Sequence, residues 1–335
     1  MASTSPMPKV PDTWKQLVAP YQQPDLRKSL WQLANTIVPY FALLILMYFS
    51  LDVSYWLTLL LAIPAAGFGV RMFIIFHDAG HGSFFKSKVA NDWLGRITGV
   101  LLFTPYYSWR HSHAIHHATS GDLDRRGTGD VWTLTKEEYD KLGRWGKLGY
   151  RLYRNPFVIF GIGPVIDFVV LQRFAWAKAD ERDRASIRNT NIALVVWITL
   201  ISLLIGFDKY VLIQLPVLMI ATGVGVWLFY VQHQFENTYW ERHEQWDFAT
   251  AALYGSSFYK LPKLLQWFTG NIGFHHIHHL SPRIPNYELE RCHNNAELFQ
   301  RVEQLTLWTS LKSLHVRLWD EDHHKMVGYH APSES

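Results

Sequence analysis

Two long apolar segments constrain this chain more than any other feature of its sequence. Residues 33–76 carry only two charged side chains, and residues 191–232 also carry only two. A membrane-spanning helix needs about 20 predominantly apolar residues, so each segment is long enough to cross a bilayer twice. Asp52 and Asp208 lie near the middle of these segments, where a turn is expected. The sequence therefore predicts four transmembrane helices arranged as two hairpins.

The amino-acid composition also favours a membrane protein. Charged residues make up 18% of the chain, below the roughly 25% that is usual in soluble domains, and aromatic residues, which gather where lipid meets water, make up 15%. The single cysteine, Cys292, excludes an intramolecular disulfide and a metal site built from several cysteines. The net charge of +4 comes without a long basic stripe, so no binding to nucleic acid is expected. We therefore expect an all-α integral membrane fold.

A third apolar segment, residues 155–172, is short and interrupted. It contains two prolines, two glycines and the charged residue Asp167, and a charge inside the hydrocarbon layer is expensive. If this segment crossed the membrane, the histidines before it and after it would lie on opposite faces. We therefore expect it to lie at the membrane interface or to re-enter on the same side.

The distribution of lysine and arginine predicts the orientation of the spans. Basic residues gather before the first apolar segment and in residues 173–188, whereas the two hairpin turns together contain only Lys209. Cytoplasmic flanks of membrane helices are enriched in lysine and arginine. Both termini and all the long polar segments are therefore expected on the cytoplasmic side of the cell (inner) membrane.

This topology divides the chain into five expected parts, with the histidines in the parts that follow each hairpin. The parts are a cytoplasmic N-terminal segment at 1–32, a first transmembrane hairpin at 33–76, a cytoplasmic cap at 77–190 that includes the interfacial segment 155–172, a second transmembrane hairpin at 191–232, and a second cytoplasmic cap with the C-terminal tail at 233–335. The expected fold is thus a four-helix membrane body carrying a histidine-rich cap.

Most of the 17 histidines fall into three tight groups close to the ends of the apolar segments, and one more follows the second hairpin directly. Within the groups, pairs four residues apart meet on one face of a helix, and two groups add a third histidine at a spacing of three. Such a face offers two or three imidazoles to one metal ion. The candidate metal ligands are His77, His81, His113, His116, His117, His233, His275, His278 and His279.

Nine imidazoles are too many for one ion, since a catalytic zinc has three protein ligands and a structural zinc has four. We therefore expect the nine imidazoles to be divided between two metal ions. The sequence lacks the HExxH motif of zinc proteases. Neutral imidazole also suits iron, and a pair of redox-active irons fits this ligand set best.

The histidine groups and the sequences around them resemble the membrane-bound fatty acid desaturases. The segments HDAGHGSFFKS, WLFYVQHQFE and TGNIGFHHIHHLSPRIPNYELE are similar to the bacterial acyl-lipid desaturases, including the Δ5 enzymes of Bacillus, whereas cyanobacterial and plant ω-6 (Δ12) enzymes are more distant. The similarity covers nearly the whole chain. It implies the O2-dependent introduction of a cis double bond into an acyl chain of a membrane lipid at a centre of two Fe ions. The Δ5 or ω-6/Δ12 type, the chain length and the head group stay open.

The resemblance assigns the nine histidines to the three histidine boxes of the family and to one additional ligand. The first box is His77 and His81, the second is His113, His116 and His117, the third is His275, His278 and His279, and the additional ligand is His233. No flavin, nicotinamide, haem or iron–sulfur motif occurs in the chain. The resemblance therefore implies an external electron donor of the ferredoxin or flavodoxin type.

Other residues near the boxes are candidates for supporting roles. Asp78, Glu236 and Asp247 could accept hydrogen bonds from the ligating imidazoles. Asn271 could complete a coordination sphere directly or through water. Three tryptophans that neighbour the boxes could line an acyl-chain tunnel, and they could equally be aromatic residues of the membrane interface. They are Trp109, Trp132 and Trp267.

Two other functions stay open at this point. One is a di-iron membrane hydroxylase or ketolase that acts on lipids or carotenoids, because the spacing of the boxes alone does not exclude it. The other is a divalent-metal transporter. Transporters place their ligands within the spans, near the middle of the bilayer, whereas the histidine groups here lie at or beyond the ends of the apolar segments.

Overall fold

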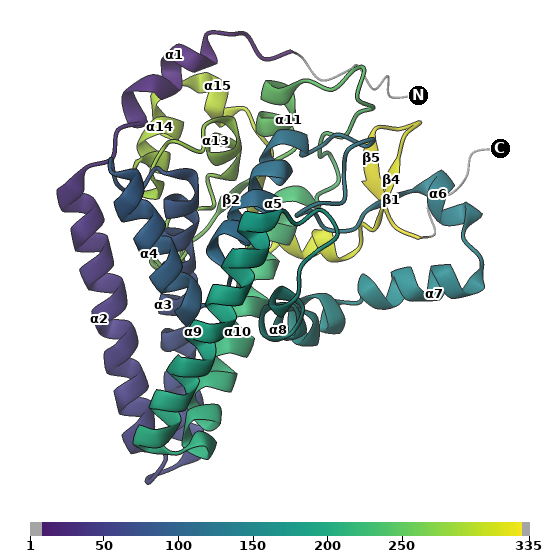
Figure 1. Cartoon of the computed structure of the whole chain (residues 1–335). Coiled ribbons are helices and arrows are strands. Elements are labelled where there is room, and N and C mark those ends of the chain that lie inside the picture. The colour runs from purple at the N-terminus through teal and green to yellow at the C-terminus, as the bar shows by residue number, and fades with distance from the viewer. Residues whose placement is uncertain (1–8, 330–335) are drawn as a thin grey trace.

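The computed structural model describes residues 9–329, so the ends of the expected first and last parts, at 1–8 and 330–335, lie outside the described residues. Within that range, four helices are long and apolar enough to cross a membrane. They form the elongated lower half of the molecule in Figure 1, and a cap of shorter elements covers one end of them. The four long helices are α2 (Leu26–Ser50), α3 (Tyr55–His81), α9 (Glu181–Ile205) and α10 (Phe207–His233).

The long helices extend beyond the apolar segments on the side of the cap. Helix α2 begins after Asp25, whose carboxylate accepts hydrogen bonds from the first free backbone N–H groups. Helix α9 begins after Asp180, which forms a capping box with Asp183. These caps lengthen both helices into polar sequence, so the helices start earlier than residues 33 and 191.

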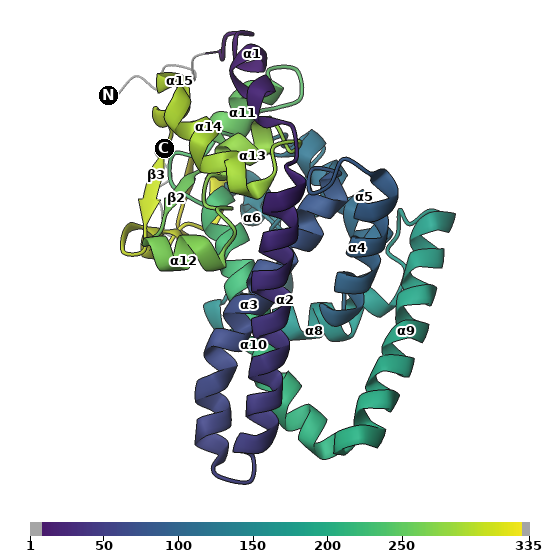
Figure 2. The ribbon, with the colours of Figure 1, turned by 90° about the vertical axis from the view of Figure 1, so that its left-hand side faces the viewer.

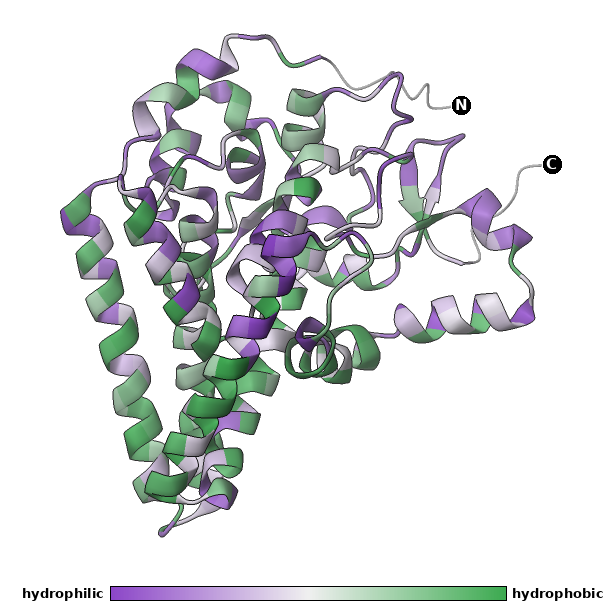
Figure 3. Cartoon of the chain, in the orientation of Figure 1, coloured by the Kyte–Doolittle hydropathy of each residue, from purple (hydrophilic) through white to green (hydrophobic). Residues whose placement is uncertain are grey.

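The outer surfaces of the long helices are apolar, as a lipid-facing surface requires. Leu203 and Leu204 on α9 are 81% and 78% exposed, and Figure 3 shows hydrophobic residues along the lower part of the molecule. Small residues of α3, such as Ala62 and Ala66, belong to the same buried cluster as Tyr40 of α2. Small residues allow membrane helices to approach each other closely.

The cap contains the remaining helices and five short strands, so the described chain is mostly helical rather than all-α. Strands β1 (Leu134–Thr135), β4 (Leu318–Asp320) and β5 (Lys325–Val327) form one sheet, and β2 (Phe258–Lys260) pairs with β3 (Gln304–Thr306). Each strand has only two or three residues, too few for an alternating pattern to be recognised in the sequence. The helices of the cap are α1 (Trp14–Val18), α4 (Lys88–Leu101), α5 (Tyr106–Thr119), α6 (Lys136–Lys141), α11 (Phe248–Tyr254), α12 (Lys263–Phe268), α13 (His275–Leu280), α14 (Leu289–Asn295) and α15 (Glu297–Gln300).

The third apolar segment forms short helices that follow α7 after a bend and run across the direction of the long helices. Helix α7 (Arg144–Tyr153) is followed by a short π-helix (Val158–Ile162) and by α8 (Gly163–Val169), with a bend of 53° after α7. Figure 1 shows α7 transverse to α9 and α10, and Figure 2 shows α8 transverse to them. Phe157, at the bend, is 87% exposed. This geometry is compatible with an interfacial or re-entrant segment, which stays a prediction.

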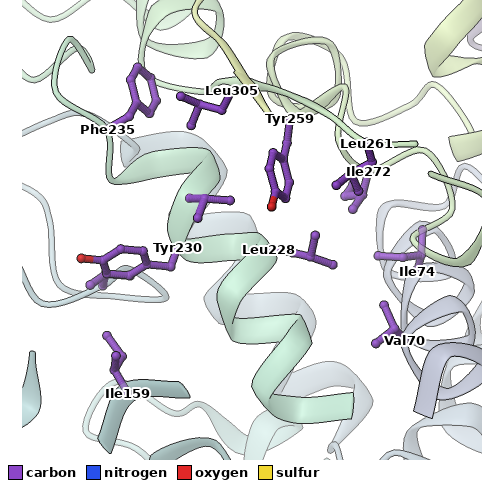
Figure 4. Close-up of a cluster of buried hydrophobic side chains, with 12 residues drawn as sticks. Val70, Ile74, Ile159, Leu228, Tyr230, Phe235, Tyr259, Leu261, Ile272 and Leu305 are labelled. Carbon is purple, nitrogen blue, oxygen red and sulfur yellow. The ribbon is translucent and has the colours of Figure 1, made fainter. Parts of the chain in front are cut away.

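One hydrophobic core joins the upper ends of the long helices to the cap. Figure 4 shows Val70 and Ile74 from α3 facing Leu228 from α10, with Ile272 from the segment before α13 beside them. These residues are each less than a tenth exposed. The core therefore holds the ends of α3 and α10, which carry candidate ligands, against the segment that leads to α13.

Candidate metal centre

The nine histidines that the sequence singled out lie close together at the junction of the long helices and the cap. Their nitrogens form two groups. The first, here called the five-histidine group, consists of His77, His81, His113, His117 and His278, whose candidate ligand atoms all lie within 4.8 Å of one another. Three histidines form the core of the second group in the same way, and His275 joins them because its Nε2 lies 3.0 Å from that of His233. This four-histidine group consists of His116, His233, His275 and His279.

The groups cut across the boxes seen in the sequence. On α5, His113 and His117 face the five-histidine group, whereas His116 between them faces the other. On α13 the pattern is reversed, because His278 joins the five-histidine group while His275 and His279 lie four residues apart in the other. Residues four apart share a helix face. Each HxxHH box therefore contributes ligands to both groups.

Several ring nitrogens of both groups lack a suitable hydrogen-bond partner, and a metal ion could take that place. His81, His116 and His279 each have a buried Nε2 without a hydrogen-bond partner in the described residues. Nε2 atoms also face each other at 3.0 Å between His117 and His278. Buried nitrogens left without partners are costly, and a metal ion in each group would satisfy them. The chain thus has two sets of side chains that could hold a metal.

Burial keeps the imidazoles of the cap in the neutral form that binds metal. Removal from water lowers the pKa of His113, His117 and His278 well below the usual value, and the neighbouring histidines lower each pKa further. The pKa values of His275 and His279 are lowered for the same two reasons. A neutral ring keeps a free lone pair, which metal binding requires.

Three acceptors fix the orientation of individual rings. His116 Nδ1 lies 2.5 Å from the carboxylate of Asp130, and His233 Nδ1 lies 3.1 Å from the carbonyl oxygen of Gly255. His77 Nδ1 lies 3.3 Å from Asp78. A ring that donates from Nδ1 presents the lone pair of Nε2 to the centre. Asp78 therefore lies within hydrogen-bonding distance of a candidate ligand, and its supporting role stays a prediction.

Asp130 is a functional candidate whose contact with His116 the sequence did not predict. It lies 14 residues after His116, at the end of a loop that also contains Gly129 with φ +74°. A Cβ on Gly129 would lie 3.0 Å from the carbonyl oxygen of Ser112, so glycine lets the loop approach α5 closely. A glycine-rich loop that ends in an acid after a histidine box was the available signal.

Asn286 is a second such residue. Its backbone N–H and its side-chain amide donate to the same oxygen of Asp78, at 2.7 and 2.8 Å. Its own Oδ1 accepts a hydrogen bond of 2.8 Å from Gln32 of α2. A hydrogen-bonded chain therefore runs from α2 through Asn286 and Asp78 to His77.

Three expected supporting residues lie elsewhere. Glu236 is exposed. Asp247 accepts from the N–H and the hydroxyl of Thr250, and so caps α11. Asn271 has φ +57°, and its amide contacts Gln266 and Asn286. Asp247 thus serves as the N-cap of α11, and Asn271 shapes a turn, so neither has a hydrogen bond to a histidine of the two groups among the described residues.

A third cluster of candidate ligands, His111, Asp180 and Asp183, has a structural explanation. The two carboxylates form the capping box of α9, and His111 Nδ1 lies 2.8 Å from Asp183. We assign this cluster to helix capping.

An apolar cavity of about 240 Å³ reaches the histidines from the membrane-level part of the molecule. It lies mainly between α3 and α10 and touches members of both groups, namely His77, His113 and His275. At its far end it is lined by Tyr40 and Gln214. The cavity can thus hold a narrow apolar molecule with part of its length beside the candidate metal centre.

Of the three tryptophans expected at a tunnel, one lines this cavity. Trp109 stacks on His113 with ring centroids 4.4 Å apart. Trp132 is 45% exposed and packs against Tyr150 and Tyr153. Trp267 is partly exposed and lies against Arg71. Trp132 and Trp267 do not line this cavity, so proximity to a box in the sequence did not decide their positions.

Comparison with known proteins places this arrangement in a family. The family model described as fatty acid desaturase matches residues 53–310. The chain is 53% identical to a fatty acid desaturase of Bacillus subtilis (strain 168) over 314 residues, which cover 94% of this chain and 89% of that protein. It is 27% identical to the sn-1 oleoyl-lipid 12-desaturase of Anabaena variabilis over 88% of this chain and 83% of that protein. It is 28% identical to the sn-1 acyl-lipid omega-3 desaturase (ferredoxin) of a Synechocystis strain, over 66% and 62% of the two chains. The matched residues include all nine histidines of the two groups, and the chain therefore belongs to the fatty acid desaturase family of oxidoreductases.

Proposed function

We propose that this protein introduces a cis double bond into an acyl chain of a membrane phospholipid, with O2 as co-substrate and two Fe ions as cofactors. The position of the new double bond is left as Δ5 or ω-6/Δ12. In this proposal, α2 with α3 and α9 with α10 cross the cell membrane as two hairpins. Both termini and the histidine groups lie on the cytoplasmic side, in agreement with the excess of lysine and arginine there.

The observation that carries the proposal is the apolar cavity that ends at both histidine groups. Burying each CH2 group of an acyl chain contributes about 0.8 kcal/mol, so a narrow apolar cavity favours such a chain. Val70, Ile74 and Leu228 offer it no hydrogen-bonding group. The geometry supports a chain whose interior methylenes, rather than its polar end, lie beside the histidines.

The five-histidine group would hold one iron and the four-histidine group the other. When bound, the irons would supply the activation of dioxygen and the removal of two hydrogens from the acyl chain. The chain itself holds the ligands in place. Asp130, Asp78 and the carbonyl oxygen of Gly255 keep the protons of three rings at Nδ1, and Trp109 covers His113 and excludes water from that side.

An external electron donor is part of the proposal. Reducing dioxygen to water takes more electrons than the acyl chain gives up when the double bond forms, so a carrier must supply the remainder. The omega-3 desaturase of Synechocystis has ferredoxin in its name. We propose a carrier of the ferredoxin or flavodoxin type that docks on the cytoplasmic side of this protein.

The test is expression of the full chain in a bacterial host without polyunsaturated lipids, with its electron carriers present. Fatty acid methyl esters are analysed by gas chromatography and mass spectrometry, and disulfide adducts locate each double bond. We expect a new unsaturated product that is absent with His278→Ala and retained with His315→Ala, which changes an exposed histidine outside both groups. A hydroxylated product would reassign the reaction to a hydroxylase. A purified protein without product and without iron would overturn the proposal.

A further inference from the structure

A second cavity, of about 450 Å³, lies between α2, α3 and α12, on a different face of α3 from the apolar cavity. This α2–α12 pocket is lined by Lys28, Trp31, Asn35, Arg71, Gln266 and Trp267, among others. Small-molecule sites usually have volumes of roughly 300–1,000 Å³. The pocket is therefore large enough for a ligand, and the reaction described above makes no use of it.

Arg71 gives the pocket an unbalanced positive charge. It is 6% exposed, and its guanidinium lies 4.0 Å from the ring of Trp267. Its partners are neutral: Nε donates to the Thr36 hydroxyl at 3.1 Å, and Nη1 donates to the Trp267 carbonyl oxygen. Within residues 9–329, no carboxylate lies within ion-pair distance of Arg71, and Nη2 makes no hydrogen bond.

The other charges of the pocket do not compensate for Arg71. Lys28 is paired with Glu288, and Lys263 is paired with Glu290. A buried charge without a counter-ion is costly. The carbonyl oxygen of the Asn35 side chain is also buried without a hydrogen-bond partner. The pocket thus offers a cation to an anionic group, and an acceptor to a neighbouring hydroxyl or amine.

The rim of the pocket has the composition of a lipid–water interface. Two apolar side chains at the rim are exposed, Trp31 at 70% and Leu264, on α12, at 68%. The basic residue Lys28 lies one turn before Trp31 on α2. Tryptophan is enriched where membrane helices pass from head groups to hydrocarbon. An anion that reaches this level of a membrane protein in quantity is the phosphate of a phospholipid.

We propose that the α2–α12 pocket binds the phosphodiester head group of a membrane phospholipid, with Arg71 donating to the phosphate and Trp31 and Trp267 flanking it. The head group would occupy the polar pocket while its acyl chains extend along the exposed apolar surface of α2. Gln266 connects the pocket through Asn271 and Asn286 to Asp78. A bound lipid would therefore also stabilise the segment that carries the third histidine box.

The proposal can be tested without iron or activity. The full chain is purified in a maltoside detergent, depleted of lipid and titrated with dioctanoyl phosphatidylglycerol in a calorimeter. Parallel titrations use dioctanoylglycerol, which lacks the phosphate, and inorganic phosphate, which lacks the lipid. We expect saturable binding of the phospholipid alone, weakened roughly tenfold or more by Arg71→Gln, since a charge-assisted hydrogen bond is lost.

Two further variants separate binding from folding. Arg96→Gln removes an exposed arginine that also stacks on a tryptophan, 5.3 Å from Trp93, and should leave the dissociation constant unchanged. Asn35→Asp keeps Arg71 and the shape of the pocket but adds a negative charge, and should weaken binding as strongly as Arg71→Gln. Equal binding of dioctanoylglycerol, equal binding of free phosphate, or phospholipid binding that neither pocket variant weakens would each overturn the proposal.

Discussion

The two histidine groups share α5 and α13 but are supported in different ways. The five-histidine group takes two candidate ligands from α3, and one of its rings, His77, has a carboxylate partner at 3.3 Å. The four-histidine group takes one candidate ligand from α10. Two of its rings contact an acceptor through Nδ1, His116 with Asp130 at 2.5 Å and His233 with a carbonyl oxygen at 3.1 Å. The group with fewer candidate ligands therefore has more rings with an Nδ1 acceptor, two against one. We infer that the first group depends on the number of its ligands and the second on their orientation.

The largest effect is expected when one candidate ligand is removed from either group, and comparing the two variants tests this contrast. His279→Ala leaves three histidines in its group, whereas His278→Ala leaves four in the other. Both variants should lose desaturation by more than ~100-fold, because loss of a ligand exceeds the 10–100-fold loss typical of outer partners. His279→Ala should also retain about one iron per chain, and His278→Ala more than that. Metal analysis of the purified variants checks the difference, and equal iron loss in both would break the comparison.

The next effect concerns orientation in the four-histidine group. Asp130→Ala removes the acceptor behind His116, so we expect metal affinity and activity to fall roughly 10–100-fold. Asp130→Asn keeps an oxygen acceptor without the charge and should lose less. Titration of metal-free protein with iron(II) measures both. Asp140→Ala, which changes an acid on the protein surface, serves as the control. An affinity that is unchanged by Asp130→Ala would mean that packing alone orients His116.

Filling the apolar cavity should hinder substrate binding without changing the metal content of either group. Gly225 lines the cavity, and a Cβ added there meets nothing within 4 Å. Gly225→Leu is therefore expected to reduce product by at least roughly tenfold while iron content stays unchanged. Gly149→Leu, at an exposed and equally open glycine of α7, should leave product formation unchanged. Loss of iron in Gly225→Leu would show that the cavity wall and the metal sites are coupled.

The sequence predicted which histidines lie together far better than it predicted the residues that contact them. The nine histidines were recognisable because spacings of three and four place imidazoles on one helix face, and the four long helices because apolar runs of that length have few alternatives. The positions of Asp130 and Asn286 follow no helical spacing from the histidines. Asn286 is 208 residues from Asp78, and only the fold brings these two residues together. Asp247 caps a helix and Asn271 forms a left-handed turn, and both roles favour the same residue types, Asp and Asn, that also support metal ligands. The short strands arise from pairings as distant as Leu134 with Leu318.

The smallest effect should come from the support of the five-histidine group. Asn286→Ala removes the side-chain bond to Asp78, but its backbone N–H still donates to the same oxygen at 2.7 Å. We therefore expect less than a tenfold loss of metal affinity, confined to this group. The free energy of unfolding should fall by about 1–3 kcal/mol, because Asp78 and Gln32 each lose a buried partner. Stepwise metal titration and thermal unfolding measure the two quantities.

The matched control is Asn295→Ala, an exposed asparagine at the end of α14, which should change neither quantity. Addition of saturating metal should restore the activity of Asn286→Ala, because all of its ligands remain, whereas His278→Ala should stay inactive. If Asn286→Ala weakened metal binding in the four-histidine group as much as in the other, the two groups would form one cooperative unit. The different hydrogen-bond partners of the two groups would then not give them different metal-binding properties.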